Sequence, residues 1–294
     1  MATRVIAPER NEPSWGRHRS GYVWYTIRRS VSAQFGLVLL AAVLLVAVAG
    51  PAVWSADPAA TSSNTLASPS LSLPFGSDQY GRDILSRVLN GIRIDIAIAV
   101  FVAVLATAVG AVFGVLAGYV GGWVEQLVMR LTDVMLAFPG FILALAIAAF
   151  LGNDIRNVIL AIGIAYTPVM IRLVRGHALS LRSASFILSS RAVGAPRWWI
   201  MLFHVLPNTV SPILVQTTLF LAWAVLDTAG LSFIGVGIRP PTPELGSMTA
   251  EGAAFMVSGA WWYAVLPGIV IMLIVLSFNL VGDAVRDILD PQSH

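Results

Sequence analysis

The chain has 294 residues, of which 57% are hydrophobic and only 11% are charged, and its formal net charge is +3. Soluble domains carry about 25% charged residues, so this composition excludes an ordinary soluble protein and indicates an integral membrane protein. All 18 basic residues are arginine and there is no cysteine. These absences exclude disulfides, Schiff-base lysines and a phosphate-binding loop that depends on lysine.

Six apolar segments predict six transmembrane helices, since a bilayer core requires about 20 residues of helix. The first segment, 35–54, is too long for the apolar region of a secretory signal, and we interpret it as a retained span. A linker rich in Ser, Thr, Pro and Ala follows it at 56–74. The other spans are expected at 94–120, 127–150, 158–174, 210–236 and 262–281.

The fold class predicted by this pattern is all-α and polytopic. We expect an N-terminal tail at 1–30, the first helix with its linker at 31–93, a core domain at 94–285 and a C-terminal tail at 286–294.

Arginine placement predicts the orientation of these spans. Eleven arginines fall on one side, namely Arg4, Arg10, Arg17, Arg19, Arg28, Arg29, Arg172, Arg175, Arg182, Arg191 and Arg197. The other side has Arg82, Arg87, Arg93, Arg156 and Arg239. Under the positive-inside rule, both termini are cytoplasmic, and the spans are expected to contact membrane lipid.

Small and polar residues within the spans suggest particular contacts. Gly110, Gly114 and Gly118 recur every four residues, a spacing that lets another helix approach closely. Arg130 and Asp133 are three residues apart and are expected to pair.

Asp227 lies in the middle of the fifth span without an obvious local partner. It either lines a pathway or makes a buried polar contact, and the sequence leaves both readings open.

Three prolines are expected to interrupt or bend their spans: Pro139, Pro168 and Pro267. The four histidines are scattered without ligand spacing, so we expect no metal site and no cofactor bound by this chain. No catalytic motif is present either, and a nucleic-acid partner is not expected.

A polar segment, 184–208, separates the fourth and fifth spans. Its sequence predicts a first short helix with small residues, a turn at Gly194, and a second short helix that has Pro196 in its first turn and ends at Leu206-Pro207-Asn208. A helix of this kind can fit into a groove of a soluble partner. The alternative is an ordinary helix at the membrane interface.

Four stretches resemble the permeases of binding-protein-dependent ABC importers of the oligopeptide, dipeptide and nickel group. Gly194, Leu206 and Pro207 match the spacing of their cytoplasmic signature, although Leu188-Ser189-Ser190 stands where Glu-Ala-Ala would be. The segments 75–87, 231–246 and 282–291 are similar to three further stretches of these permeases. The stretches Ser-Phe-Ile-Gly and Pro-Pro-Thr-Pro-Glu-Leu-Gly favour the second, C-type permease of the pair.

This resemblance implies the type I importer fold and a transport subunit without its own ATPase site. A coupling helix at 185–199 would contact the ATPases through Ser189, Ser190, Ala192, Gly194, Leu206 and Pro207. The implied partners are a homologous second permease, two ATP-binding subunits that use ATP and Mg, and an extracytoplasmic substrate-binding protein.

The loop 238–260 is expected to help receive the binding protein, with Pro240, Pro241, Glu244 and Gly246 near its start and an acidic character from Glu244 and Glu251. The substrate would be a peptide or, alternatively, a nickel or other metal chelate. A secondary transporter or an intramembrane enzyme remains an alternative class.

Overall fold

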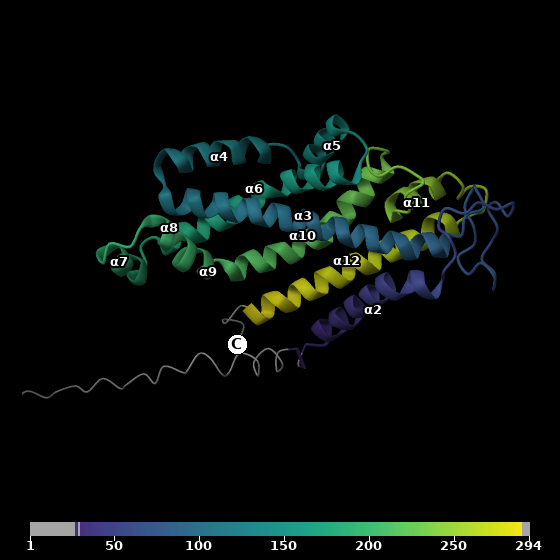
Figure 1. The fold of residues 1–294 in the computed structure, drawn as a ribbon, viewed down its shortest axis with the longest axis horizontal. Helices are drawn as coiled ribbons and strands as arrows, with labels where there is room; N and C mark the ends of the chain where they lie inside the picture. Colours follow the sequence, from purple (N-terminus) through teal and green to yellow (C-terminus); the bar gives the residue numbers. More distant parts are fainter. Residues whose placement is uncertain (1–26, 29, 290–294) are drawn as a thin grey trace, which may run out of the picture.

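The computed structural model describes residues 27–28 and 30–289, and within them all regular elements are helical apart from one isolated bridge between Ser77 and Asp83. Figure 1 shows long helices lying side by side in an elongated bundle. In chain order, the elements are α2 (Val31–Val53), α3 (Ile84–Val120), α4 (Gly122–Leu136), α5 (Gly140–Leu151), α6 (Ile155–Leu181), α7 (Ser185–Ala192), α8 (Arg197–Ile200), the π-helical turn η1 (Met201–Val205), α9 (Leu206–Asn208), α10 (Val210–Phe233), α11 (Leu245–Ala253) and α12 (Trp262–Leu289).

Side-chain caps fix where several helices begin. The hydroxyl of Ser30 accepts a hydrogen bond from Ala33 N at 3.2 Å, and Asp83 accepts one from Leu85 N at 2.9 Å. Asp154 caps α6 in the same way. The second and fourth spans therefore begin earlier than predicted, at Ile84 and Ile155, because polar first turns are stabilised by caps that hydropathy does not detect.

Within the described residues, five helices are long and apolar enough to cross a membrane, and the count is six if α4 and α5 together form one span. Pro139 interrupts the span expected at 127–150, as predicted, and α4 and α5 meet there at an angle of 90°. The break lies at Phe138-Pro139, where proline disfavours helical backbone in the residue before it. Pro168 and Pro267, in contrast, lie inside the continuous helices α6 and α12, so they do not interrupt their spans as expected.

The predicted glycine stripe is the contact surface between α3 and α6. A Cβ atom at Gly114 would lie 2.6 Å from the Cβ of Val174, and one at Gly118 would lie 2.6 Å from the carbonyl oxygen of Arg175. Gly110 faces Met170 in the same way. The prediction of a close helix approach is thus confirmed.

The predicted pair of Arg130 with Asp133 is wrong. Asp133 instead accepts a hydrogen bond from Arg172 at 2.7 Å, and Glu125 pairs with Arg175. Both acidic residues lie on α4 and both of these arginines on α6, so the ion pairs tie the two helices together. Pairing across helices depends on tertiary packing, which spacing along one helix does not contain.

Candidate functional site

The segment 184–208 lies at one end of the bundle, at the left of Figure 1. Its first helix, α7, ends in a Schellman motif, in which Gly194 N donates to Arg191 O at 3.0 Å and Ala195 N donates to Ser190 O at 3.1 Å. Gly194 has a φ of +81°, a conformation that non-glycine side chains rarely adopt. The predicted turn is therefore confirmed, and it follows a helix of eight residues.

α7 is largely uncovered, and part of its uncovered surface is apolar. Ile187 is fully buried and anchors the helix, whereas Phe186, Leu188 and Val193 are exposed, Val193 to 85%. Ser189 and Ala192 are exposed beside them. A short helix that has one anchor and an uncovered apolar surface can contact another protein.

The second predicted helix differs from the expectation. Pro196 is the residue before α8 rather than a residue of its first turn, and Pro207 lies within α9 and does not end the segment. The chain is helical from 197 to 233 with the sole exception of Thr209. The coupling helix expected at 185–199 thus ends at Ala192. The residues from Arg197 onward instead form a helical extension that precedes α10. The signal for a second helix was correct, but nothing in its sequence showed that it joins the next span.

Asp227 lies at a cavity where the break between α4 and α5 faces α6 and α10. The hydroxyl of Tyr166 donates a hydrogen bond of 2.8 Å to its Oδ2 atom. Tyr166 in turn stacks on Phe220 with ring centroids 4.9 Å apart. The cavity has a volume of about 320 Å³ and is lined by Met135, Leu136, Phe138, Gly140, Phe141, Ala165, Tyr166, Val169, Trp223 and Asp227.

Both readings of Asp227 find support in this arrangement. The carboxylate has a partner, Tyr166, which the sequence did not indicate because it lies 61 residues away. It also lines an otherwise largely aromatic and aliphatic cavity. A single carboxylate in such surroundings can bind a cationic or hydrogen-bonding group of a solute.

At the opposite end of the bundle, the loop 238–260 contains the short helix α11. Glu244 is its N-cap and is fully buried, accepting hydrogen bonds from Gly246 N at 2.8 Å and Ser247 N at 2.7 Å. Burial raises the pKa of Glu244, and the two N–H donors oppose this effect. The expectation that Glu244 gives the loop an exposed acidic character is therefore wrong. Gly246 lies inside α11, against the backbone of Ala229.

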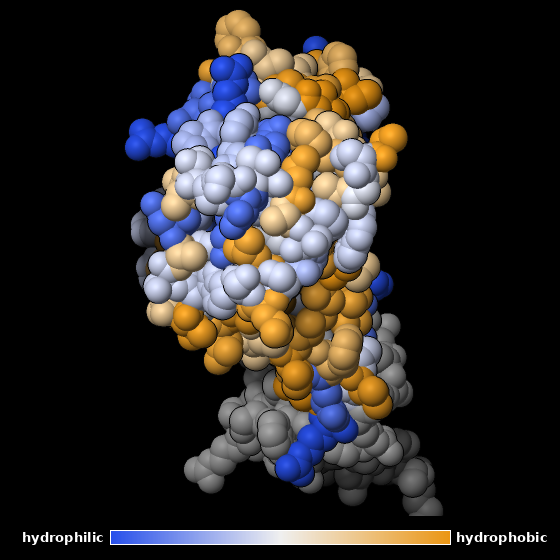
Figure 2. All heavy atoms as spheres, turned by 90° about the vertical axis from the view of Figure 1, so that its right-hand side faces the viewer, coloured by the Kyte–Doolittle hydropathy of each residue, from blue (hydrophilic) through white to orange (hydrophobic). Residues whose placement is uncertain are grey.

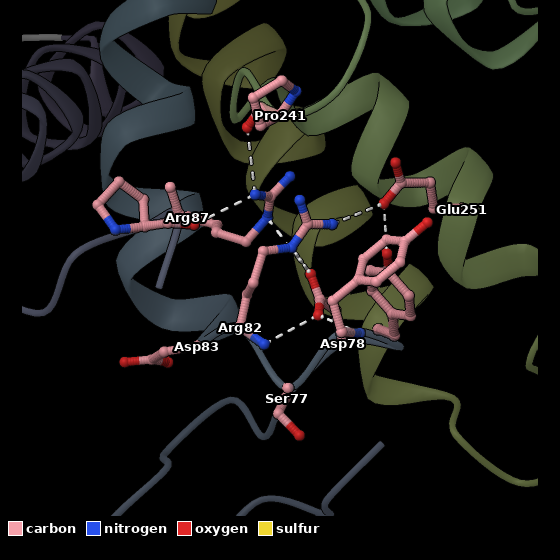
Figure 3. A network of polar contacts seen from close by, with 12 residues as sticks. Ser77, Asp78, Arg82, Asp83, Arg87, Pro241 and Glu251 are labelled. Carbon is pink, nitrogen blue, oxygen red and sulfur yellow. Dashed lines mark hydrogen bonds and ion pairs between the residues drawn. The ribbon is translucent and has the colours of Figure 1, made fainter. Parts of the chain in front are cut away.

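A buried ionic network joins this loop to the linker before α3 (Figure 3). Asp78 is fully buried and lies within ion-pair distance of Arg82 and, at 3.7 Å, of Arg87. Arg82 also reaches Glu251 at 3.4 Å, and Glu251 accepts a hydrogen bond from Tyr263. Glu251 is thus an internal residue of the network and not an exposed acid.

Arg87, the second arginine of the network, also donates hydrogen bonds to the backbone carbonyl groups of two prolines. Arg87 Nη1 donates to Pro58 O at 3.2 Å and to Pro241 O at 3.3 Å. Two stretches that carried the family resemblance, 75–87 and 231–246, therefore lie together in space. In the sequence alone, Arg82 and Arg87 count only as charges that set the orientation. The resemblance of 75–87 to a stretch of known permeases is the one feature that indicates a further role for them.

Figure 2 shows the surface of this end of the molecule. A central region of polar or intermediate hydropathy has strongly hydrophobic side chains below it and at its upper right, and hydrophilic ones at its upper left. The network therefore holds a comparatively polar end face in place on an apolar bundle. A face of this kind suits contact with a soluble protein.

The chain is similar to a family of known membrane transport proteins. Residues 110–293 match the family model described as the binding-protein-dependent transport system inner membrane component. The chain is 40% identical over 267 residues to the dipeptide transport system permease protein DppC of Alkalihalophilus pseudofirmus, covering 90% of this chain and 88% of that protein. It is 43% identical over 295 residues to the glutathione transport system permease protein GsiD of Shigella flexneri and that of Escherichia coli, covering 99% of this chain and 95% of those proteins.

Substituting Asp78 tests whether the buried network stabilises the outer end. Asp78→Asn leaves Arg82 and Arg87 buried without their shared carboxylate, and we expect a loss of about 3–5 kcal/mol in the free energy of unfolding. The control is Asp133→Asn, which breaks the exposed pair with Arg172 and should cost no more than about 1 kcal/mol. Thermal and denaturant unfolding of the purified protein in detergent measures both values. Equal effects of the two substitutions would contradict a stabilising role of the buried network.

Proposed function

This chain belongs to the family of inner membrane components of binding-protein-dependent transport systems, and we propose that it forms half of the translocation pathway of a peptide importer. The identities of 40% and 43% to a dipeptide and a glutathione permease, each over most of both chains, support peptides as the substrate class. We place nickel and other metal chelates second. Among the described residues no group of three or more metal-ligating side chains could hold an ion.

We propose that α7 is the helix that couples this subunit to ATP-binding partners. The observation that carries this proposal is the uncovered apolar surface of α7 next to a rigid Schellman turn at Gly194. Closure of two ATPases would move α7, and α7 is joined to α6 by a connection of only three residues. The chain has no lysine for a phosphate-binding loop of its own, so the energy would come from ATP and Mg bound by those partners.

The remaining partners follow from the same proposal. A homologous permease would form the other half of the pathway, and an extracytoplasmic binding protein would deliver the peptide to the end face that carries α11. Both termini would be cytoplasmic in a bacterial inner membrane, as the arginine distribution supports.

Gly194 provides a test of the coupling helix. Its position has a φ of +81°, and a Cβ atom there would meet nothing within 4 Å, so Gly194→Val introduces backbone strain without a clash. Strain of about 1–2 kcal/mol should weaken association with the ATPases about tenfold while the subunit stays inserted. Co-purification of the ATPases and transport-linked ATP hydrolysis in liposomes are the measurements.

The matched control for this test is Gly259→Val. Gly259 also has a positive φ, +93°, and equally open surroundings, but it lies in the loop before α12. It should leave ATPase association unchanged. If Gly194→Val retains full association and coupled transport, α7 is not the coupling helix.

A second test concerns Asp227 as a residue that lines the pathway. Asp227→Asn keeps the shape of the side chain and its contact with Tyr166 but removes the charge. We expect uptake of a dipeptide or of glutathione to fall about tenfold, as for the loss of one charge-assisted hydrogen bond, with ATPase association unchanged. Tyr166→Phe is the control, since it removes the internal hydrogen bond and keeps the carboxylate. Equal losses of thermal stability in both variants, without a separate transport defect, would assign Asp227 a purely structural role.

The orientation is tested with reporters at two positions. A reporter after His294 should be active only in the cytoplasm, and one fused at the fully exposed Leu71 of the linker should be active only outside. Activity on the opposite side at either position would overturn the proposed topology.

A further inference from the structure

A polar cavity lies between the end of α3 and the segment that contains α7. Its volume is about 270 Å³, and it is lined by Tyr119, Val120, Arg182, Arg191, Gly194, Ala195, Arg197 and Ile200. Three of these eight residues are arginines, and none is acidic. The arginines come from three different places in the fold, namely the residue after α6, the last turn of α7 and the start of α8.

The charges of these three arginines are not balanced within the described residues. Arg172 and Arg175, which lie on α6, each pair with a carboxylate of α4. No carboxylate in the described part of the chain pairs with Arg182, Arg191 or Arg197. The guanidinium of Arg191 lies over the ring of Tyr119, 4.9 Å from its centroid, and its Nε donates to the Tyr119 hydroxyl at 3.1 Å. The cavity is therefore a place of concentrated positive charge.

A separate apolar groove is lined by neighbouring residues of α3 and of the segment that begins with α8. Its volume is about 520 Å³, and it is lined by Ala108, Ala111, Val112, Val115, Leu116, Trp198, Met201, Leu202 and Leu206. The two hollows are neighbours along the same two stretches of chain, because Leu116 and Val120 lie one helical turn apart on α3 and Arg197 is followed directly by Trp198. From 108 to 120, α3 rises about 18 Å, which is comparable to the thickness of one leaflet of the hydrocarbon core.

We propose that this composite site binds an anionic phospholipid, with its phosphate among the three arginines and an acyl chain in the groove. Guanidinium groups form bidentate hydrogen bonds with phosphate oxygens. A free phosphate would occupy only the polar cavity and would leave the groove without a ligand, whereas a lipid matches both hollows and their order. Trp198 and Trp199 are exposed beside the groove, and exposed tryptophans are enriched at the headgroup layer of membranes. A lipid bound in this site bridges α3, α6 and α7.

The test is a lipid titration of the full-length purified chain in a neutral detergent, read by native mass spectrometry. Phosphatidylglycerol and phosphatidylcholine with identical acyl chains are compared, and soluble glycerol phosphate is the third ligand. We expect phosphatidylglycerol to bind most tightly. The double variant Arg182→Gln with Arg197→Gln should weaken its binding about thirtyfold, since each arginine near a charged lipid surface contributes a factor of about five. Arg172→Gln, which removes an arginine that has its own carboxylate, should leave binding unchanged.

The groove is tested independently of the charges. Val112→Trp fills it and should weaken phosphatidylglycerol binding, whereas Val104→Trp, at an equally exposed position of α3 outside the groove, should not. Equal affinity for both phospholipids would overturn the proposal. Binding of glycerol phosphate as tight as that of the lipid would assign the arginines to a soluble anion and overturn the role of the groove. These outcomes do not depend on the transport activity.

Discussion

The arrangement of the whole chain depends on the close approach of α3 and α6. Three glycines of α3 lie against α6 with no room for a single Cβ atom. Because hydrophobic burial does not drive association between helices in lipid, such backbone contact supplies the van der Waals packing that replaces it. The two helices therefore form a central pair. α2, α4, α5 and α10 lie against it, and α12 packs mainly on α2, α10 and α11 (Figure 1).

The central pair connects the two ends of the molecule. α3 begins next to the buried network of Asp78, Arg82 and Arg87, and it ends at the cavity of unpaired arginines. α6 begins just after α5, passes the break between α4 and α5 near its middle, and leads into α7. A displacement of α7 would therefore act on a helix pair in which the far end of α3 is held by buried ions. Asp227 and its cavity lie between these ends, where α10 and α6 meet.

The sequence predicted the class of fold, the number of spans, the glycine contact and the turn at Gly194, because each depends on local spacing or on one residue type. It did not predict the broken third span as a right angle, since proline shows that a helix ends but not the direction in which the chain continues. Partners across helices were also missed: Asp133 pairs with Arg172, and Asp227 with Tyr166. Glu244 was expected to give its loop an acidic character, but its position before α11 makes it a buried cap. The missed contacts join residues that only the packed helices bring together.

The two ends use arginine in opposite ways, and this difference is informative. At the end that carries α11, Arg82 and Arg87 are buried and share carboxylates from the same chain. Breaking buried pairs is costly, so this end keeps one structure. At the other end, Arg182, Arg191 and Arg197 are exposed and have no carboxylate partner in the described chain. Exposed charges can exchange ligands at little cost. The end proposed to contact the ATP-binding subunits and a phospholipid is thus the end whose charges are left without partners in the described chain.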